Sequence, residues 1–134
     1  MAVAEKYDVT SDVIPGIATG FCGGMSRTSG MCGALSGGVM ALGILFGRNL
    51  PEDSNTKIYA LTAQLVRDFE KKFGSANCSD ILGCDLSTPE GDEVFKAKNL
   101  GKTLCRDITV KATELVMQVL ENQDDIRSSF KIPS

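Results

Sequence analysis

The sequence contains no histidine and no tryptophan, and aromatic residues make up only 6% of it. Without histidine, a protease built on a cysteine–histidine pair lacks its usual general base. The few aromatic rings argue against a surface that stacks on nucleobases. A net charge of −3 without any basic cluster also argues against nucleic-acid binding. These absences leave thiol chemistry as the most informative signal in the chain.

The sequence also shows no stretch typical of an export signal and no convincing membrane span. The first ten residues carry Glu5, Lys6 and Asp8, where a signal peptide needs an apolar stretch. The uncharged run 28–47 has about the length of a membrane span. However, six glycines, two serines and a threonine lower its hydropathy, so we expect a buried helix without membrane insertion. The predicted location is the cytoplasm, where permanent structural disulfides are rare.

The cysteine count is odd, which is not typical of a disulfide framework. The five residues are Cys22, Cys32, Cys78, Cys84 and Cys105. In a reducing compartment this count indicates one of two arrangements. The thiols are either scattered through the core or gathered in a cluster with redox or metal chemistry.

A helix rich in glycine is predicted at the centre of the fold, between Ser29 as N-cap and Gly47 as its end. Small residues on one side would let another helix of the same chain approach closely. These are Gly33, Gly37 and Ala41. The oligomeric state stays open, because the same row could pack against a second copy. The apolar side has steps of three and four residues, which define one helix face, and consists of Cys32, Leu35, Val39, Leu42 and Phe46.

Helical periodicity and capping signals predict the remaining elements. Helices are expected over residues 12–21, 51–73, 88–98 and 103–122, with a single helical turn that Gly83 ends. No strand pattern is present. The fold class is therefore all-α, a single compact bundle of about five helices around the central helix.

The chain is expected to form one helical domain with polar ends. The domain spans residues 11–122, which is long enough to bury a hydrophobic core. Residues 1–10 are expected to form a flexible N-terminus, and residues 123–134 a polar C-terminal tail.

Two cysteines, Cys32 and Cys105, fall in the first turns of predicted helices, where free N–H groups and the macrodipole stabilise a thiolate. Arg106 adds a positive charge beside Cys105. Asp85, in contrast, disfavours the thiolate of Cys84. A mixed set with one easily ionised thiol suits thiol–disulfide exchange.

Cys22 lies in the glycine-rich segment 20–24, which predicts a tight loop with positive φ angles. This loop is either a plain connector between helices or a mobile thiol that faces Cys32. The other four cysteines fall at helix ends and turns, so we expect them to share one site.

Two other interpretations compete with exchange chemistry. Four thiolates, those of Cys32, Cys78, Cys84 and Cys105, suffice for a closed zinc site or an iron–sulfur cluster. Their spacings match no compact Cys-x-x-Cys knuckle. In the third interpretation the cysteines are small buried hydrophobes without chemistry.

The order of these motifs resembles the C-GCAxxG-C-C family, small proteins found mostly in bacteria and archaea and described as redox-active. The resemblance covers about residues 14–115. The residues that carry it are Cys32-Gly33-Ala34-x-x-Gly37, Gly47-Arg48, Asn77-Cys78, the run Leu82-Gly83-Cys84-Asp85-Leu86-Ser87-Thr88-Pro89-Glu90-Gly91, and Leu104-Cys105.

The resemblance implies roles for individual cysteines. Cys32, Cys84 and Cys105 correspond to the invariant cysteines of the family, and Cys78 to a frequent one. The family usually has a further cysteine on an N-terminal helix, which this chain lacks. Either Cys22 takes its place or this member has lost part of the site.

Together these patterns favour a cytoplasmic protein that uses clustered cysteines for thiol–disulfide exchange or electron transfer. Cys32 is the expected attacking thiolate, and Cys84 or Cys105 completes the disulfide. Cys78 and Cys22 are the candidate resolving thiols. The partner is expected to be another redox protein whose identity the sequence does not indicate.

Overall fold

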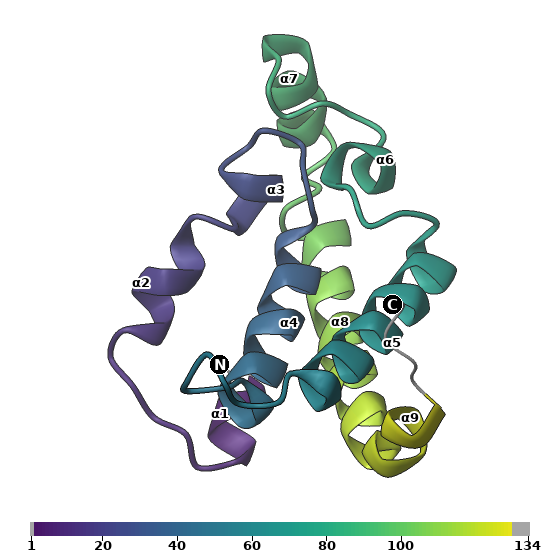
Figure 1. The fold of residues 1–134 in the computed structure, drawn as a ribbon. Coiled ribbons are helices and arrows are strands. Elements are labelled where there is room, and N and C mark those ends of the chain that lie inside the picture. The colour runs from purple at the N-terminus through teal and green to yellow at the C-terminus, as the bar shows by residue number, and fades with distance from the viewer. Residues whose placement is uncertain (1, 130–134) are drawn as a thin grey trace.

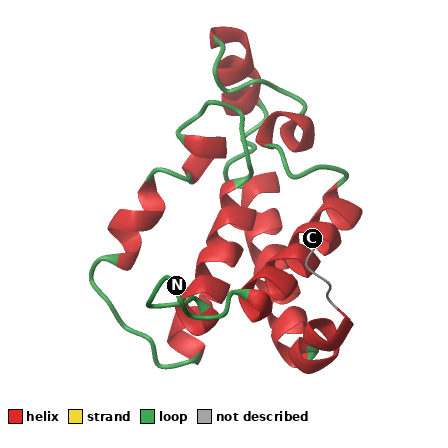
Figure 2. Cartoon of the chain, viewed as in Figure 1, coloured by secondary structure: helices red, strands yellow, loops and turns green. Residues whose placement is uncertain are grey.

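The computed structural model describes residues 2–129. Its helices in chain order are α1 (Ala2–Lys6), α2 (Ile14–Thr19), α3 (Cys22–Met25), α4 (Gly33–Phe46), α5 (Thr56–Phe73), α6 (Cys78–Leu82), α7 (Pro89–Ala97), α8 (Leu104–Glu121) and α9 (Gln123–Ser129) (Figure 1). Over this range no strand forms (Figure 2). The predicted all-α class is confirmed.

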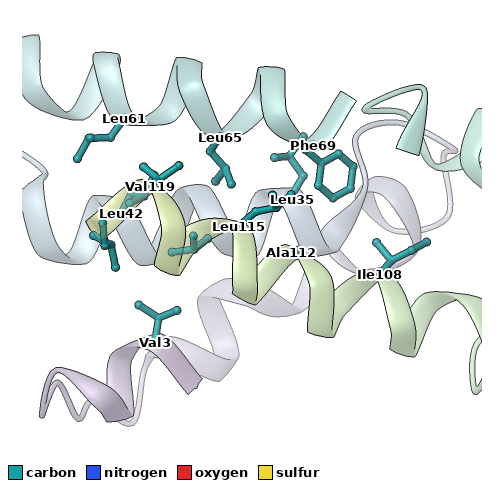
Figure 3. Packing of buried hydrophobic residues seen from close by; sticks show 12 residues of the cluster. Val3, Leu35, Leu42, Leu61, Leu65, Phe69, Ile108, Ala112, Leu115 and Val119 are labelled. Atoms are coloured by element: carbon teal, nitrogen blue, oxygen red, sulfur yellow. The ribbon is translucent and has the colours of Figure 1, made fainter. Parts of the chain in front are cut away.

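Three long helices, α4, α5 and α8, contact one another and enclose the core. Leu35 and Leu42 of α4 are fully buried, as the predicted apolar face requires. The opposing α5 contributes side chains such as Leu65 and Phe69, which face α4 and α8 in Figure 3. Burying each such side chain contributes about 1.5–3 kcal/mol. The central position of α4 follows from this pairing with two amphipathic partners.

The closest helix contact of α4 is made by Gly38, which is not in the predicted row of small residues. A Cβ on Gly38 would lie 3.0 Å from both Leu65 Cδ2 and Val116 Cγ2. Gly37 is exposed, and a Cβ there would meet nothing within 4 Å. The prediction of a close approach is therefore wrong for Gly37, whereas a Cβ on Gly33 would meet the backbone at the start of α3, 3.4 Å from the Cα of Cys22. Positions 37 and 38 differ by about 100° around the helix, and here Gly38 is buried while Gly37 is exposed.

The start of α4 also differs from the prediction. Cys32, not Ser29, occupies the N-cap position. Ser29 has a positive φ of 61°. Its hydroxyl donates to Asp85 Oδ1 at 2.7 Å and accepts from the Leu86 N–H at 2.9 Å. The Ser29 hydroxyl is therefore bound to Asp85 and Leu86, more than fifty residues away, and does not cap the helix.

The predicted start of α5 at Pro51 is wrong as well, because the helix begins at Thr56. Asp53 explains the delay. Its Oδ2 accepts hydrogen bonds from the N–H groups of Asn49 and Leu50 at 3.1 and 3.0 Å. This local turn competes with helix formation, as short acidic side chains often do.

Several predicted helix ends are confirmed. Gly74 and Gly83 end α5 and α6 in the left-handed conformation, with φ of 82° and 66°. Thr88 caps α7, since its hydroxyl oxygen accepts from the Gly91 N–H at 3.1 Å. Asn122 follows the last residue of α8, as expected.

Near both ends of the described range, a short helix contacts the bundle. In the N-terminal segment, α1 contacts α4 and α8, and Val3 is part of the core. In the expected polar tail, α9 contacts α5, and Ile126 packs against the core. Met1 and residues 130–134, which belong to the same expectations, lie outside the described residues.

The short helices α3, α6 and α7 gather at the end of the bundle where α4 and α8 both begin, whereas α9 lies at the opposite end (Figure 1). Segments from three parts of the sequence therefore meet beside the first turns of two long helices. Within residues 2–129, none of the helices has the length and apolarity that a membrane crossing requires.

Candidate functional site

A short antiparallel bridge links the segment before α4 to the segment before α6. The Cys32 N–H donates to the carbonyl of Ala76 at 2.8 Å, and the Cys78 N–H donates to the carbonyl of Gly30 at 2.7 Å. Successive side chains in such a pair alternate between its two faces. Cys32 and Cys78 therefore lie on the same face, as diagonal neighbours within about 7–8 Å.

Gly24 in α3 packs directly on Cys78. A Cβ on Gly24 would lie 2.5 Å from the Cβ of Cys78 and 2.9 Å from the carbonyl oxygen of Gly30. Its φ of +68° is also one that side chains other than glycine rarely adopt. The positive φ angles expected in the glycine-rich segment are thus present, and they serve a close approach to a buried cysteine.

Cys22 lies beside the first residue of α4. A Cβ on Gly33 would be 2.8 Å from the carbonyl oxygen of Phe21 and 3.4 Å from the Cα of Cys22. Since Gly33 follows Cys32 directly, the backbone of Cys22 is next to the start of the central helix. The Cys22 residue is exposed, unlike the other four cysteines.

Cys105 sits in the first turn of α8, and its N–H donates to the carbonyl of Leu100 at 2.9 Å. Burial raises the pKa of its thiol, and the thiolates of Cys32 and Cys84 raise it further. The pKa of Cys105 thus moves away from the thiolate that Arg106 and the helix start led us to expect. Desolvation of a half-buried sulfur outweighs them, since it penalises the charged form.

Cys78 is the most buried of the five thiols, with 6% of its surface exposed. Its pKa is raised to about 11, first by burial and then by the neighbouring thiolates, against which Arg27 acts in the opposite direction. The neighbours that raise it are, in order, Cys32, Cys105 and Cys84. A charge influences another group only over a short distance in a screened solution. Cys32, Cys84 and Cys105 therefore act on Cys78 although they belong to other segments of the chain.

Polar contacts tie the loop around Cys84 to the segment before α4. Hydrogen bonds from the hydroxyls of Ser87 and Ser29 lower the pKa of Asp85. The Asp85 carboxylate thus acts as an acceptor that joins two loops. Sequence reasoning missed this pairing, because it treated Ser29 as a helix cap and Asp85 only as a neighbour of Cys84.

A second tie links Arg27 to α7. Arg27 forms an ion pair with Asp92, which also pairs with Lys96 one turn later. Both partnerships lower the pKa of Asp92. The pairing holds the loop after α3 against α7. No sequence motif signals it, because the partners are 65 positions apart.

A cavity of about 480 Å³ opens beside the cysteines, between α4 and α8. Four of the five thiols line it, and Cys84 does not. Among the described residues, no charged side chain lines this cavity. The four thiols that line the cavity are those of Cys22, Cys32, Cys78 and Cys105. The predicted small row Gly33, Gly37 and Ala41 forms part of its wall.

The metal interpretation required thiolates from Cys32, Cys78, Cys84 and Cys105 around one ion. In the part of the chain that the structure describes, no three histidine, cysteine or carboxylate side chains are arranged to hold a metal ion. The geometry thus gathers the sulfurs without forming a ligand set. A disulfide, which needs only two sulfurs in contact, makes smaller demands on this arrangement.

Comparison with known proteins gives one family and one relative. A family model described as "Putative redox-active protein (C_GCAxxG_C_C)" matches residues 1–119. A protein of Archaeoglobus fulgidus described as uncharacterized is 26% identical over 132 residues, which covers 92% of this chain and 82% of that protein. No solved structure matches.

Proposed function

Since the chain belongs to the C_GCAxxG_C_C family of redox-active proteins, we propose that it exchanges electrons through thiol–disulfide chemistry at the cysteine cluster. The observation that carries the proposal is that Cys32, Cys78 and Cys105, which come from three separate segments, line one cavity. Such clustering of perturbed ionisable groups beside a cavity is typical of functional sites.

Cys32 is the proposed attacking group. It occupies the N-cap of α4, where the unpaired N–H groups and the macrodipole favour negative charge. It is half-buried and lines the cavity, so a substrate can reach its sulfur. Cys78 is a poor attacker by comparison, because its raised pKa leaves little thiolate at neutral pH.

The reaction proceeds by two exchanges of sulfur. The Cys32 thiolate attacks one sulfur of a substrate disulfide, and the other substrate sulfur leaves and takes up a proton. The thiolate of Cys84 or Cys105 then attacks the Cys32 sulfur and releases the second substrate thiol. Two protein thiols are oxidised to one disulfide while the substrate disulfide is reduced to two thiols. We place this activity in the cytoplasm, which maintains the reduced starting state.

The test is a count of free thiols after mild oxidation. The reduced protein is treated under anaerobic conditions with hydroxyethyl disulfide, unfolded, and assayed for thiols, with metal content measured in parallel. We expect loss of two of the five thiols and their return with dithiothreitol. Peptide mapping should place the new disulfide between Cys32 and Cys84 or Cys105.

Two variants sharpen this experiment. Cys32→Ser should abolish the reversible loss, and an unchanged loss would remove Cys32 from the attacking role. Cys22→Ser decides whether the exposed thiol replaces the missing N-terminal cysteine of the family. If that variant also loses the reaction, Cys22 is part of the pair. Five thiols that stay inert, or a metal bound at unit stoichiometry, would contradict the exchange function.

A further inference from the structure

The cavity beside α4 is lined in a way that restricts its ligand. Its wall contains small residues, apolar side chains and thiols, and in the described part of the chain no charged group. A charge placed there would lose its hydration without gaining a partner, which is costly. Arg27, the cation that acts on Cys78, is already paired with Asp92. The site therefore disfavours charged ligands.

The polar atoms of the wall do not call for a polar ligand either. The hydroxyl of Thr109 donates to the carbonyl of Cys105 at 2.8 Å, and that of Thr113 donates to the carbonyl of Thr109 at 2.9 Å. Their hydrogens are thus satisfied one turn back along α8. With a volume of about 480 Å³, the cavity is in the size range of small-molecule sites.

We propose that this cavity binds uncharged, largely apolar small-molecule disulfides and presents them to the thiol of Cys32. This inference rests on the proposed exchange function and names its substrate class. The substrate's S–S bond breaks, one of its sulfurs bonds to Cys32, and the other leaves with a proton. Disulfides that carry carboxylates or phosphates are excluded by the uncharged wall. The second substrate thiol is then released as the protein disulfide closes.

The experiment compares two aromatic disulfides that differ in charge. One is 4,4′-dithiodipyridine, which is uncharged, and the other is 5,5′-dithiobis(2-nitrobenzoate), which carries two carboxylates. Both probes react with thiols regardless of the reduction potential of the protein, because the aromatic thiols that they release are good leaving groups. Second-order rates are measured by absorbance in a Cys22→Ser background, which removes the exposed thiol. Rates with the urea-unfolded chain correct for intrinsic reactivity.

We expect folding to favour the uncharged probe by about tenfold or more over the charged one, because only the charged probe must lose its hydration to enter. The rate with the uncharged probe should also saturate with concentration, since binding precedes exchange. Peptide mapping should find Cys32 in the protein disulfide that replaces the mixed disulfide. A corrected rate ratio within about twofold of one would overturn the inference, because the cavity would then not select by charge.

A pair of variants in α4 tests whether the cavity is the binding site. In Gly37→Leu the new side chain starts from open space and enters the cavity. Gly43→Leu is the matched control: a Cβ on Gly43 also meets nothing within 4 Å, but Gly43 does not line the cavity. Circular dichroism checks that both variants fold.

Gly37→Leu should slow the uncharged probe by about tenfold and abolish saturation, because the leucine occupies the space that the ligand needs. Gly43→Leu should behave as the parent. Equal rates for the two variants would overturn the inference. The reversible two-thiol oxidation would still stand in that case, so the failure of the substrate class and the failure of the exchange function are distinguishable.

Discussion

Alanine substitutions at the adjacent glycines of α4, Gly37 and Gly38, should have opposite effects on stability. Both positions lie inside the helix, where alanine in place of glycine contributes about 0.5–1 kcal/mol. A Cβ on Gly37 meets open space, so Gly37→Ala should gain this amount in full. The helix propensity term is the same for both variants, so their difference isolates packing.

For Gly38→Ala the added Cβ would lie 3.0 Å from Leu65 and from Val116. Both neighbours are only 1% exposed, so neither can move into solvent. Overpacking of this kind costs about 1–3 kcal/mol, which exceeds the propensity gain. The two variants should therefore differ in free energy of unfolding by about 1–3 kcal/mol, with Gly38→Ala the less stable.

Urea unfolding followed by circular dichroism measures this difference. With a denaturant slope of about 2 kcal/mol per molar, a 2 kcal/mol difference separates the two midpoints by about 1 M. The slope itself should not change, since both variants bury the same core. Equal midpoints, or a Gly37→Ala variant less stable than Gly38→Ala, would refute the close packing at Gly38 and the open space beside Gly37.

Two further predictions concern Cys78. Its pKa of about 11 in the folded protein, against 9.0 for an ordinary thiol, should make stability fall between these pH values, because the folded state there holds a proton that the unfolded chain has released. A shift of two pKa units corresponds to a loss of at most about 2.7 kcal/mol in the free energy of unfolding. The loss is measured between pH 9 and 11 as the extra destabilisation of the reduced parent relative to Cys78→Ala. If the free energy of unfolding falls with pH equally in both proteins, the burial of this thiol is contradicted. Gly24→Ala should destabilise the protein by about 2 kcal/mol or more, because of its positive φ and the contact with Cys78. Gly16→Ala is the control in the same urea assay: Gly16 lies inside α2 with no neighbour within 4 Å, so this variant should be neutral or gain up to about 1 kcal/mol. A Gly24→Ala variant as stable as the Gly16 control would refute the close approach of α3 to Cys78.

The periodicity of apolar residues was sufficient to predict the long helices and their buried faces. Leu35, Leu42, Leu65 and Phe69 are all buried, because a helix with one apolar side can remove it from water only by facing a partner. Helix ends were predictable where the signal is local, as with Gly74. The start of α4 was mispredicted because a distant group intervened, through the bond between Ser29 and Asp85. The start of α5 was mispredicted because the local turn at Asp53 competes with the helix.

The sequence by itself determined the fold class and the presence of five thiols near helix ends, because both follow from residue types and short-range spacing. Only the tertiary structure decided which glycine of α4 packs closely against the neighbouring helices, since Gly37 and Gly38 look alike in a sequence. It also decided the ionisation of the cysteines. Local rules favoured a thiolate at Cys105, but burial and three-dimensional neighbours raise its pKa instead. Desolvation depends on everything that packs around an atom, and that packing is settled by contacts between segments far apart in the chain.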